Sequence, residues 1–399
     1  MIPSAFVSLE TLPRLPNGKV DRAALPAPEQ GVAAGSRAPK DRIELDLAQI
    51  WGELLGARPI DAGANFFALG GHSLLAVRLI AQIRQRFGVE LPLTIVFERP
   101  TLEQLASLLR REQAIPRPSP LVKIQERGTG RPFFCVHPIG GNVFCYWQLA
   151  RELGSAQPFY GLQTPEPELG VQPAATIEAM ASEYLEAVRS VAPEGPYRLG
   201  GWSMGGLVAF EMARQLLEAG EAIEILALLD TAAPRGSKTV AALDDTVLIA
   251  EFSRDLGALT GAAIDVSPAE LAPWSDERRW LHVLGLAQAA GALPPEIDLA
   301  TLRRHFEAFK RNRVAMLAYR PQPFSGHLVL YAAESSGELA RRDPSLGWAA
   351  LAAGGVEVVP AAGDHYGMLE GSHVATLAED LARKLNDKTL QTQNDRRIG

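Results

Sequence analysis

The fold of this chain is decided by one stretch of its sequence, YRLGGWSMGGLVAFEMARQLLEAG at residues 197–220. The apolar run YRLGG predicts a strand, and the amphipathic pattern over 205–219 predicts a helix. Between them, GWSMG at 201–205 matches G-x-S-x-G, in which a strained strand-to-helix turn exposes a serine hydroxyl. The strand before and the helix after are the context that this turn requires. We therefore predict that Ser203 is a nucleophile rather than a buried or capping serine.

Short apolar runs alternate with helical patterns on both sides of this turn. The other runs are FFCVH at 133–137, PFYGL at 158–162, IEILALLD at 223–230, HLVLY at 327–331 and VEVVP at 356–360. Apolar strands that alternate with helices predict a parallel sheet covered by helices on both faces. Residues 231–326 separate two of these strands by far more chain than one crossover helix needs. Helical patterns near 244–256, 276–290 and 299–318 predict a helical insertion there, which we interpret as a lid.

A serine nucleophile needs a base, and the base needs an acid to orient it. His365 follows the last expected strand, and the order nucleophile, acid, histidine is the one used with this turn. Asp230 ends the strand 223–230 and Glu334 follows the strand 327–331, so topology alone leaves both open as the acid. Asp364 adjoins His365 but points to the other side of the chain. The remaining candidates are expected to be core or surface histidines: His137, His282, His305, His327 and His373.

The negative charge that develops on the substrate oxygen needs backbone donors. The N–H of Met204 directly follows the nucleophile and points into the site. The second donor usually comes from a glycine-rich loop after an early strand, and HPIGGN at 137–142 fits. We favour Ile139, with Gly140 as the alternative, over an ordinary glycine-rich turn. Loss of one such donor costs about a hundred- to a thousandfold in rate.

The chain divides by composition into several segments. These are a Pro- and Gly-punctuated stretch at 1–26, a linker at 27–40, a helical region at 41–111, a proline-containing linker at 112–120, the strand–helix region at 121–388 and a polar tail at 389–399. Within the helical region, periodicity predicts helices over 41–56, about 73–87 and 101–111, with Gly56 as a C-terminal stop. About seventy residues of helices form a small bundle.

A second serine stands in a similar setting, LGGHSLLAVRL at residues 69–79. Ser73 begins the second expected helix, so it is either the N-cap of that helix or a site of chemistry. Ala76 stands three residues later, where a capping box would place Glu or Gln. The residues alone leave both interpretations open.

Bulk properties exclude several classes of protein. A net charge of −7, with no block of like charges, argues against a nucleic-acid partner. The two cysteines, Cys135 and Cys145, suit neither a disulfide framework nor a metal site, and they fit a reducing cytoplasm. The start MIPSAFVSLE lacks the pattern of a signal peptide. Residues 132–150 are uncharged but are interrupted by polar residues, Pro and Gly, so we expect a soluble protein without a membrane partner.

Three motifs resemble parts of nonribosomal peptide synthetases, in the order in which those enzymes use them. LPRLPNGKVDRAALP at 12–26 resembles the end of an adenylation domain, and NFFALGGHSLLAVRL at 65–79 resembles a peptidyl carrier protein. GWSMGG at 201–206, LLDTAAP at 228–234 and GDHYGML at 363–369 resemble a terminal type I thioesterase domain. The resemblance implies a fragment of a termination module. Its fold would be a small all-α carrier bundle over 41–111 followed by an α/β-hydrolase domain with a lid at about 232–320.

The resemblance also assigns roles to particular residues. It implies that Ser73 receives 4'-phosphopantetheine, whose phosphodiester is favoured at a helix N-terminus. It favours Asp230 over Glu334 as the acid. Lys19 matches the catalytic lysine of adenylation domains, but the nucleotide-binding core of such a domain is missing, so we expect Lys19 to be inert and ATP-dependent activity to be absent.

The implied activity is acyl transfer. A peptidyl thioester on Ser73 passes to Ser203, and water or an internal nucleophile releases the peptide by hydrolysis or macrocyclisation. The implied partners are upstream condensation and adenylation domains, a phosphopantetheinyl transferase with coenzyme A, and the peptidyl substrate. Two alternatives are an editing thioesterase that removes misloaded acyl groups and a non-catalytic docking module.

Overall fold

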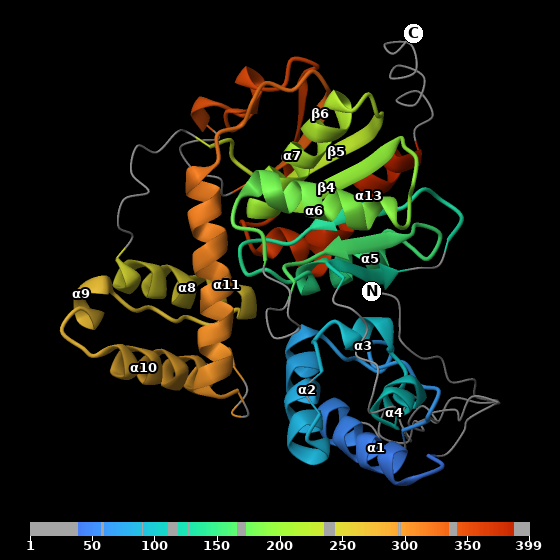
Figure 1. Ribbon diagram of the computed structural model, residues 1–399, viewed down its shortest axis with the longest axis vertical. Coiled ribbons are helices and arrows are strands. Elements are labelled where there is room, and N and C mark those ends of the chain that lie inside the picture. The colour runs from blue at the N-terminus through green and yellow to red at the C-terminus, as the bar shows by residue number, and fades with distance from the viewer. Residues whose placement is uncertain are drawn as a thin grey trace, which may run out of the picture.

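The computed structural model describes residues 39–386 except for 57–59, 90, 111–118, 126–127, 166–172, 235–243, 294, 296 and 335–340. Several of our predictions lie outside these residues: the adenylation-like stretch 1–26 with Lys19, nearly all of the linker 27–40, most of the linker 112–120 and the tail 389–399. Figure 1 shows a small helical unit, a helix-covered sheet and a second helical unit beside the sheet. This arrangement agrees with the predicted order of a carrier bundle, a sheet domain and a helical insertion.

The N-terminal unit is a helical bundle built from α1 Arg42–Leu55, α2 Ser73–Phe87, α3 Ile95–Glu98 and α4 Leu102–Arg110. Its core includes the fully buried Trp51 and Leu79. Gly56 ends α1 in the left-handed conformation, with φ of 64°, as predicted. One interpretation is corrected, because the N-cap of α2 is His72 and Ser73 is the first helical residue. The short helix α3 was not predicted, since four residues are too few to show periodicity.

The sheet has seven strands in the order β1-β3-β2-β4-β5-β6-β7. They are β1 Leu121–Gln125, β2 Phe133–Val136, β3 Phe159–Leu162, β4 Tyr197–Trp202, β5 Ile223–Leu229, β6 Leu328–Ala333 and β7 Val356–Ala361. The strands from β2 to β7 pair in parallel, as predicted. The prediction of a purely parallel sheet is wrong at one edge, because β1 pairs antiparallel with β3.

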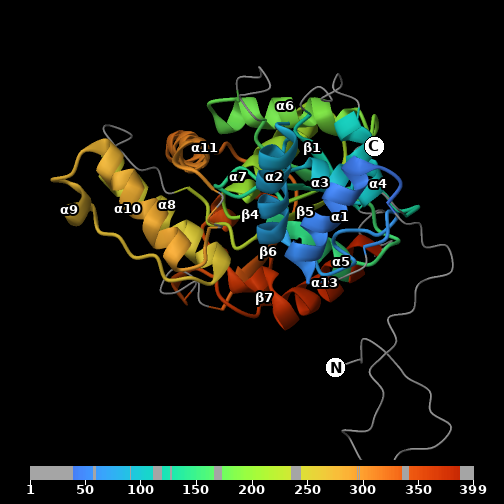
Figure 2. The same ribbon diagram turned by 90° about the horizontal axis from the view of Figure 1, so that it is seen from below.

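Helices cover both faces of the sheet, as the apolar strands predicted. Helices α6 Ile177–Arg189 and α7 Met204–Glu218 pack on one face. Helices α5 Trp147–Glu152 and α13 Gly371–Asn386 pack on the other. Figure 2 shows α6 and α13 on opposite sides of the strands. Successive residues of β2 enter different cores, with Phe133 in the α13 core and Phe134 in the α7 core.

The chain between β5 and β6 forms the predicted helical insertion, which we call the lid. It consists of α8 Asp245–Thr260, α9 Pro268–Leu271, α10 Asp276–Ala289 and α11 Leu299–Ala318. The lid has its own apolar core, which contains Phe252, Trp280 and Phe306. Because this core belongs to the insertion itself, the lid is a separately packed layer beside the sheet (Figure 1). None of the helices described here is both long and apolar enough to cross a membrane.

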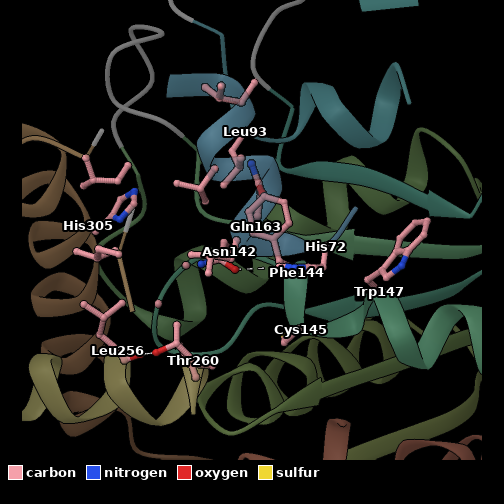
Figure 3. A pocket seen from close by; sticks show the side chains of 18 of the residues that line it. His72, Leu93, Asn142, Phe144, Cys145, Trp147, Gln163, Leu256, Thr260 and His305 are labelled. Atoms are coloured by element: carbon pink, nitrogen blue, oxygen red, sulfur yellow. Dashed lines mark hydrogen bonds between the residues drawn. The ribbon is translucent and has the colours of Figure 1, made fainter. Parts of the chain in front are cut away.

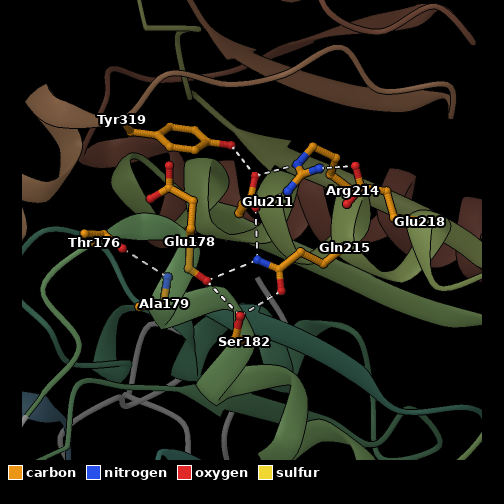
Figure 4. Close-up of polar contacts among 9 residues, drawn as sticks. All are labelled: Thr176, Glu178, Ala179, Ser182, Glu211, Arg214, Gln215, Glu218 and Tyr319. Atoms are coloured by element: carbon orange, nitrogen blue, oxygen red, sulfur yellow. Dashed lines mark hydrogen bonds and ion pairs between the residues drawn. The ribbon is translucent and has the colours of Figure 1, made fainter.

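A polar network fixes the C-terminal end of the lid to the sheet domain (Figure 4). The hydroxyl of Tyr319, directly after α11, donates to Glu211 Oε2 on α7 at 2.9 Å. Burial raises the pKa of Glu211, but hydrogen bonds from Arg214, Gln215 and Tyr319 outweigh this and lower it below its usual value. Gln215 also donates to the carbonyl of Glu178 on α6 at 3.1 Å. The last lid helix is therefore anchored to α7, the helix that begins next to Ser203.

Candidate active site

Ser203 lies in the turn between β4 and α7 and has a strained backbone. Its φ and ψ are 57° and −124°, which non-glycine residues rarely adopt. The turn is so tight that a Cβ on Gly201 would lie 2.2 Å from the carbonyl carbon of Gly205. The N–H of Ser203 donates to the Leu229 carbonyl at 3.0 Å and ties the turn to the end of β5. The predicted strand, turn and helix are all present.

Asp230 follows β5 directly and faces His365. The distance from His365 Nδ1 to Asp230 Oδ2 is 2.6 Å, and the aspartate side chain is only 9% exposed. The other carboxylate oxygen, Oδ1, accepts from the N–H of Ala333 at 3.0 Å. The N–H of Asp230 donates to the Tyr331 carbonyl at 2.7 Å, and its φ is 39°. Contacts from β6 therefore orient the carboxylate toward the imidazole.

The two other acids considered lie elsewhere. Glu334 is exposed at the end of β6, where its N–H donates to the carbonyls of Ala361 and Gly363. Asp364 Oδ1 accepts from the N–H groups of Tyr366 and Gly367 and so shapes the loop that carries His365. Of the three candidate acids, the structure brings Asp230 to the imidazole.

Trp202 brings the loop of His365 to the serine turn. Its indole Nε1 donates to the carbonyl of His365 at 2.9 Å, and the two ring centroids are 5.0 Å apart. Trp202 is the residue before Ser203, so this contact joins the two loops directly. With Nδ1 of His365 turned to Asp230, Nε2 is the ring nitrogen left to accept a proton from a serine hydroxyl.

The candidate backbone donors lie at the start of α7 and in the glycine-rich loop after β2. Met204 is the first residue of α7, so its N–H has no carbonyl partner within the helix. No hydrogen bond among the described residues is donated by the N–H of Ile139 or Gly140, so both remain candidates. The carbonyl of Ile139 accepts from Asn312 Nδ2 on the lid helix α11 at 2.8 Å, and Asn312 is fully buried.

Asn312 was missed by the sequence analysis. A single asparagine in an amphipathic helix carries no motif, and only its contact with Ile139 reveals its place. Because it holds the peptide that follows Ile139, Asn312 couples the lid to the candidate oxyanion loop.

His137 is a core residue, as expected. It is fully buried, with its Nε2 2.8 Å from the hydroxyl of Tyr184, and burial lowers its pKa to about 4. It is therefore neutral at physiological pH. In the lid, His282 Nε2 lies 3.5 Å from Glu270 Oε1. His373 Nδ1 lies 3.1 Å from the carbonyl oxygen of Gly367.

A cavity of about 1560 Å³ joins three parts of the molecule. Its walls include His72 and Leu74 from the start of α2, Asn142 from the glycine-rich loop and His305 from α11. Figure 3 shows His72 and Leu93 of the carrier bundle and His305 of the lid around this space. The lining also includes Trp202 and Tyr366, the sequence neighbours of Ser203 and His365. The cavity thus extends from the start of α2 to Trp202 and Tyr366, whereas Ser203 and His365 are not themselves part of its lining.

Aromatic stacking holds the carrier bundle against the sheet domain. The ring of Phe67 stacks on Trp147 of α5 with centroids 4.1 Å apart. The ring of Phe97 in α3 stacks on Phe144 at 4.9 Å. These contacts form one continuous apolar cluster across the two units. They hold the bundle in the position in which the start of α2 lines the cavity.

The start of α2 suits a phosphodiester. The first turn of α2 carries no acidic residue, whereas Arg84 and Arg86 lie in its last turn. Free N–H groups at a helix N-terminus favour anions. Ser73 is the first residue of this helix, and its neighbours line the cavity. The residues present therefore fit a phosphopantetheine group on Ser73.

Comparisons with known proteins agree with this geometry. A family model described as a thioesterase domain matches residues 131–385, and one described as a phosphopantetheine attachment site matches residues 46–109. The chain is 35% identical over 334 residues to a dimodular nonribosomal peptide synthase of Bacillus subtilis. This match covers 83% of this chain and 14% of that protein. It is 30% identical over 407 residues to chondramide synthase of Chondromyces crocatus, covering 99% of this chain and 10% of that protein. The chain thus spans only a small part of these relatives.

One solved structure is similar to nearly the whole of this chain. It is a holo four-domain nonribosomal peptide synthetase bound to AMP and glycine. The TM-score is 0.64 with 32% sequence identity, and the match covers 97% of this chain and 29% of that one. Both the carrier bundle and the sheet domain are therefore included in the likeness.

Proposed function

Because the chain belongs to the thioesterase domain family and carries a phosphopantetheine attachment region ahead of that domain, we propose that it releases a finished peptide in nonribosomal peptide biosynthesis. The acyl group moves from a thioester on the Ser73 arm to Ser203 and leaves by macrocyclisation or hydrolysis. One observation carries this proposal. A single cavity is lined both by the residues around Ser73 and by Trp202 and Tyr366 beside Ser203 and His365.

The proposed chemistry begins at the serine turn. When attached, the arm presents the acyl group as a thioester. The Ser203 hydroxyl attacks the acyl carbonyl, and His365 Nε2 accepts the hydroxyl proton. The Asp230 carboxylate stabilises the imidazolium through the 2.6 Å contact at Nδ1. The carbon–sulfur bond breaks, and His365 returns its proton to the leaving thiolate. The acyl group is then an ester on Ser203.

The backbone N–H groups of Met204 and Ile139 are the proposed donors to the developing oxyanion. The free N–H at the start of α7 and the loop fixed by Asn312 support this assignment. In the second half of the reaction His365 accepts a proton from water or from an amine or hydroxyl of the peptide. A well-oriented internal group can reach an effective molarity of about 10⁵–10⁸ M, so a lid that orders the acyl chain favours cyclisation.

The docked carrier supports a substrate delivered from within the same chain. Upstream condensation and adenylation domains of the synthetase are the proposed source of the peptide. A phosphopantetheinyl transferase with coenzyme A is the proposed source of the arm. A reducing compartment such as the cytoplasm suits the two cysteines, which are both unpaired in the structure.

The test is to load Ser73 with a peptidyl phosphopantetheine, using coenzyme A thioesters and a transferase, and to follow loss of the thioester. We expect turnover that Ser203→Ala abolishes, and the product mass identifies water or an internal nucleophile as the acceptor. An editing enzyme would instead prefer short acyl groups over the peptide. A docking module would show no turnover, and Ser203→Ala would change nothing; either result contradicts the proposal.

A further inference from the structure

The lid helix α11 carries several basic residues, and most of them bind carboxylates of the lid itself. Arg303 pairs with Asp276, Lys310 with Asp245 and Arg313 with Glu251. Arg311 differs from these three. Within the part of the chain that the structure describes, Arg311 forms no ion pair or hydrogen bond, and its Nε is buried without a partner. The carboxylate of Glu307, one turn earlier on α11, attracts the Arg311 guanidinium, but the two groups do not form an ion pair.

Arg311 lines the cavity, as do Gly141, Gln163 and Thr164, and a Cβ on Gly141 would lie 3.6 Å from Nδ2 of the adjacent Asn312. Two fully buried groups sense its charge: burial lowers the pKa of His137 and Arg311 adds to that shift, whereas burial raises the pKa of Tyr184 and Arg311 opposes that shift. The adjacent residue, Asn312, binds the carbonyl of Ile139. Arg311 therefore lines the cavity and directly precedes the residue that holds the candidate oxyanion loop.

A half-buried guanidinium without a counter-ion is costly, because burial removes water and no carboxylate replaces it. Burial accordingly lowers the pKa of Arg311. Arginine is the residue best suited to binding a carboxylate or phosphate, because its planar fork donates two parallel N–H bonds. An anion supplied by the substrate would give this guanidinium the partner that its three neighbours on α11 already have.

We propose that Arg311 binds a carboxylate on the acyl chain of the thioester substrate and therefore selects acidic acyl chains. The inference rests on the proposed function and deepens it. The same chemistry could come from the phosphodiester of the arm. The arm, however, separates its phosphate from the thioester by its whole length, whereas Arg311 lies beside the oxyanion loop, so we assign the anion to the acyl chain.

The experiment measures kcat/KM for peptidyl N-acetylcysteamine thioesters, which carry no phosphate. Paired peptides place either glutamate or glutamine at one of the three residues nearest the thioester. For one of these positions, we expect the wild-type chain to prefer glutamate by about ten- to a hundredfold, the usual worth of a hydrogen-bonded charge pair. Arg311→Gln should abolish this preference, and Arg311→Lys should retain part of it. The result is the ratio of kcat/KM for the glutamate and glutamine peptides, so a change in turnover common to both peptides is not part of this preference.

Arg313→Gln is the matched control, because it removes the same charge from the same helix at a residue paired with Glu251 outside the cavity lining. It should keep the wild-type preference for glutamate. The same peptides as coenzyme A thioesters test the arm. If Arg311→Gln slows only the coenzyme A thioesters, whatever the acyl charge, the anion is the phosphate and our assignment to the acyl chain is overturned. If wild type shows no preference at any position, the inference fails, while turnover of the glutamine peptides still upholds the proposed function.

Discussion

Two serines of this chain follow nearly the same local sequence, LGGHS at 69–73 and LGGWS at 199–203, yet their backbones differ. Ser203 has a φ of 57° and precedes its helix, whereas Ser73 is the first residue of a regular helix. In the first stretch a turn over residues 66–70 leads to the helix, and in the second a buried strand leads to it. The element that precedes the Gly-Gly pair therefore decides whether the serine is strained.

The setting of Ser203 is assembled from distant segments, whereas that of Ser73 is local. A strained backbone of this kind costs about 1–3 kcal/mol and persists only where surrounding contacts impose it. Around Ser203 these contacts come from the end of β5, the His365 loop and, through Asn312, the lid. A helix start such as that of Ser73 requires no strain. Distant substitutions should therefore change reactions at Ser203 and leave phosphopantetheinylation of Ser73 unaffected.

The largest effect is expected from the serines themselves. Ser203→Ala should lower turnover of a small-molecule peptidyl thioester by about 10⁶-fold and leave attachment of the arm intact, since removal of a serine nucleophile has this effect in other hydrolases. Ser73→Ala should prevent attachment of the arm and leave turnover of the small thioester near wild type. Intact-mass spectrometry and a thiol-release assay measure the two reactions. Loss of both reactions in either variant would break the comparison.

A smaller loss is expected when the acid is neutralised. Asp230→Asn keeps the shape of the side chain but favours the wrong imidazole tautomer, and a comparable change in another hydrolase costs about 10⁴-fold in kcat. Glu334→Gln, at the exposed end of the neighbouring strand, is the control and should keep wild-type activity. Steady-state kinetics with the small thioester measure both variants. Equal losses in the two variants would show that the 2.6 Å contact of Asp230 with His365 is not the functional one.

The strands next to the serine turn show how much of the fold could be predicted from sequence. The strands from β2 to β6 are short apolar runs, and burial on both faces makes such runs conspicuous, whereas β7 at the sheet edge is only partly buried. The edge strand β1 was missed because LVKIQ includes the exposed Lys123, and its position depends on pairing with β3, which no local pattern encodes. The lid helices α8, α10 and α11 were predicted because each buries one face in the lid core, whereas the four-residue α9 is too short to show periodicity and was not predicted.

The candidate site was predictable only in part for a related reason. Ser203 and His365 stand in local motifs, so sequence alone identified them as candidates. Asp230 and Glu334 follow neighbouring parallel strands, and only the hydrogen bond from Ala333 shows which carboxylate turns to the imidazole. Arg311 and Asn312 belong to no motif. Their proposed roles depend on the Ile139 carbonyl that Asn312 binds and on the cavity that Arg311 lines, and both are features of the tertiary structure.

A modest effect is expected from the lid contact with the oxyanion loop. Asn312→Leu keeps the buried volume but removes the donor to the Ile139 carbonyl. Complete loss of an oxyanion donor costs about a hundred- to a thousandfold, and a loosened loop should cost less, roughly tenfold in kcat with little change in KM. Arg313→Gln on the same helix is the control. An Asn312→Leu variant that raised KM alone would indicate a role in substrate binding instead, and attachment of the arm to Ser73 should not change.

The smallest effect on catalysis is expected at a second contact between the lid and the His365 loop. Asp255 on α8 accepts from the hydroxyl of Tyr366 at 3.0 Å, and burial raises the pKa of Asp255 to about 6 from its usual 3.8. Between pH 3.8 and about pH 6 the folded state therefore binds more protons than the unfolded state. The free energy of unfolding consequently falls as the pH rises through this range. The loss should reach about 3 kcal/mol above pH 6.

Asp255→Asn keeps an acceptor for Tyr366 and removes the charge, so this fall should disappear. Relative to wild type, the variant should gain stability between pH 4 and pH 7, which denaturant unfolding at the two pH values measures. Asp265→Asn, at an exposed residue of the lid, should shift stability equally at both pH values. The contact involves Tyr366, the residue after His365, so turnover at pH 7 is measured as well. A gain in stability with unchanged turnover would mean that Tyr366 needs only a hydrogen-bond acceptor. Lost turnover would mean that the Asp255 charge acts on the imidazole of His365. In either case attachment to Ser73 should match wild type, because Asp255 is not among the residues that line the cavity beside the start of α2.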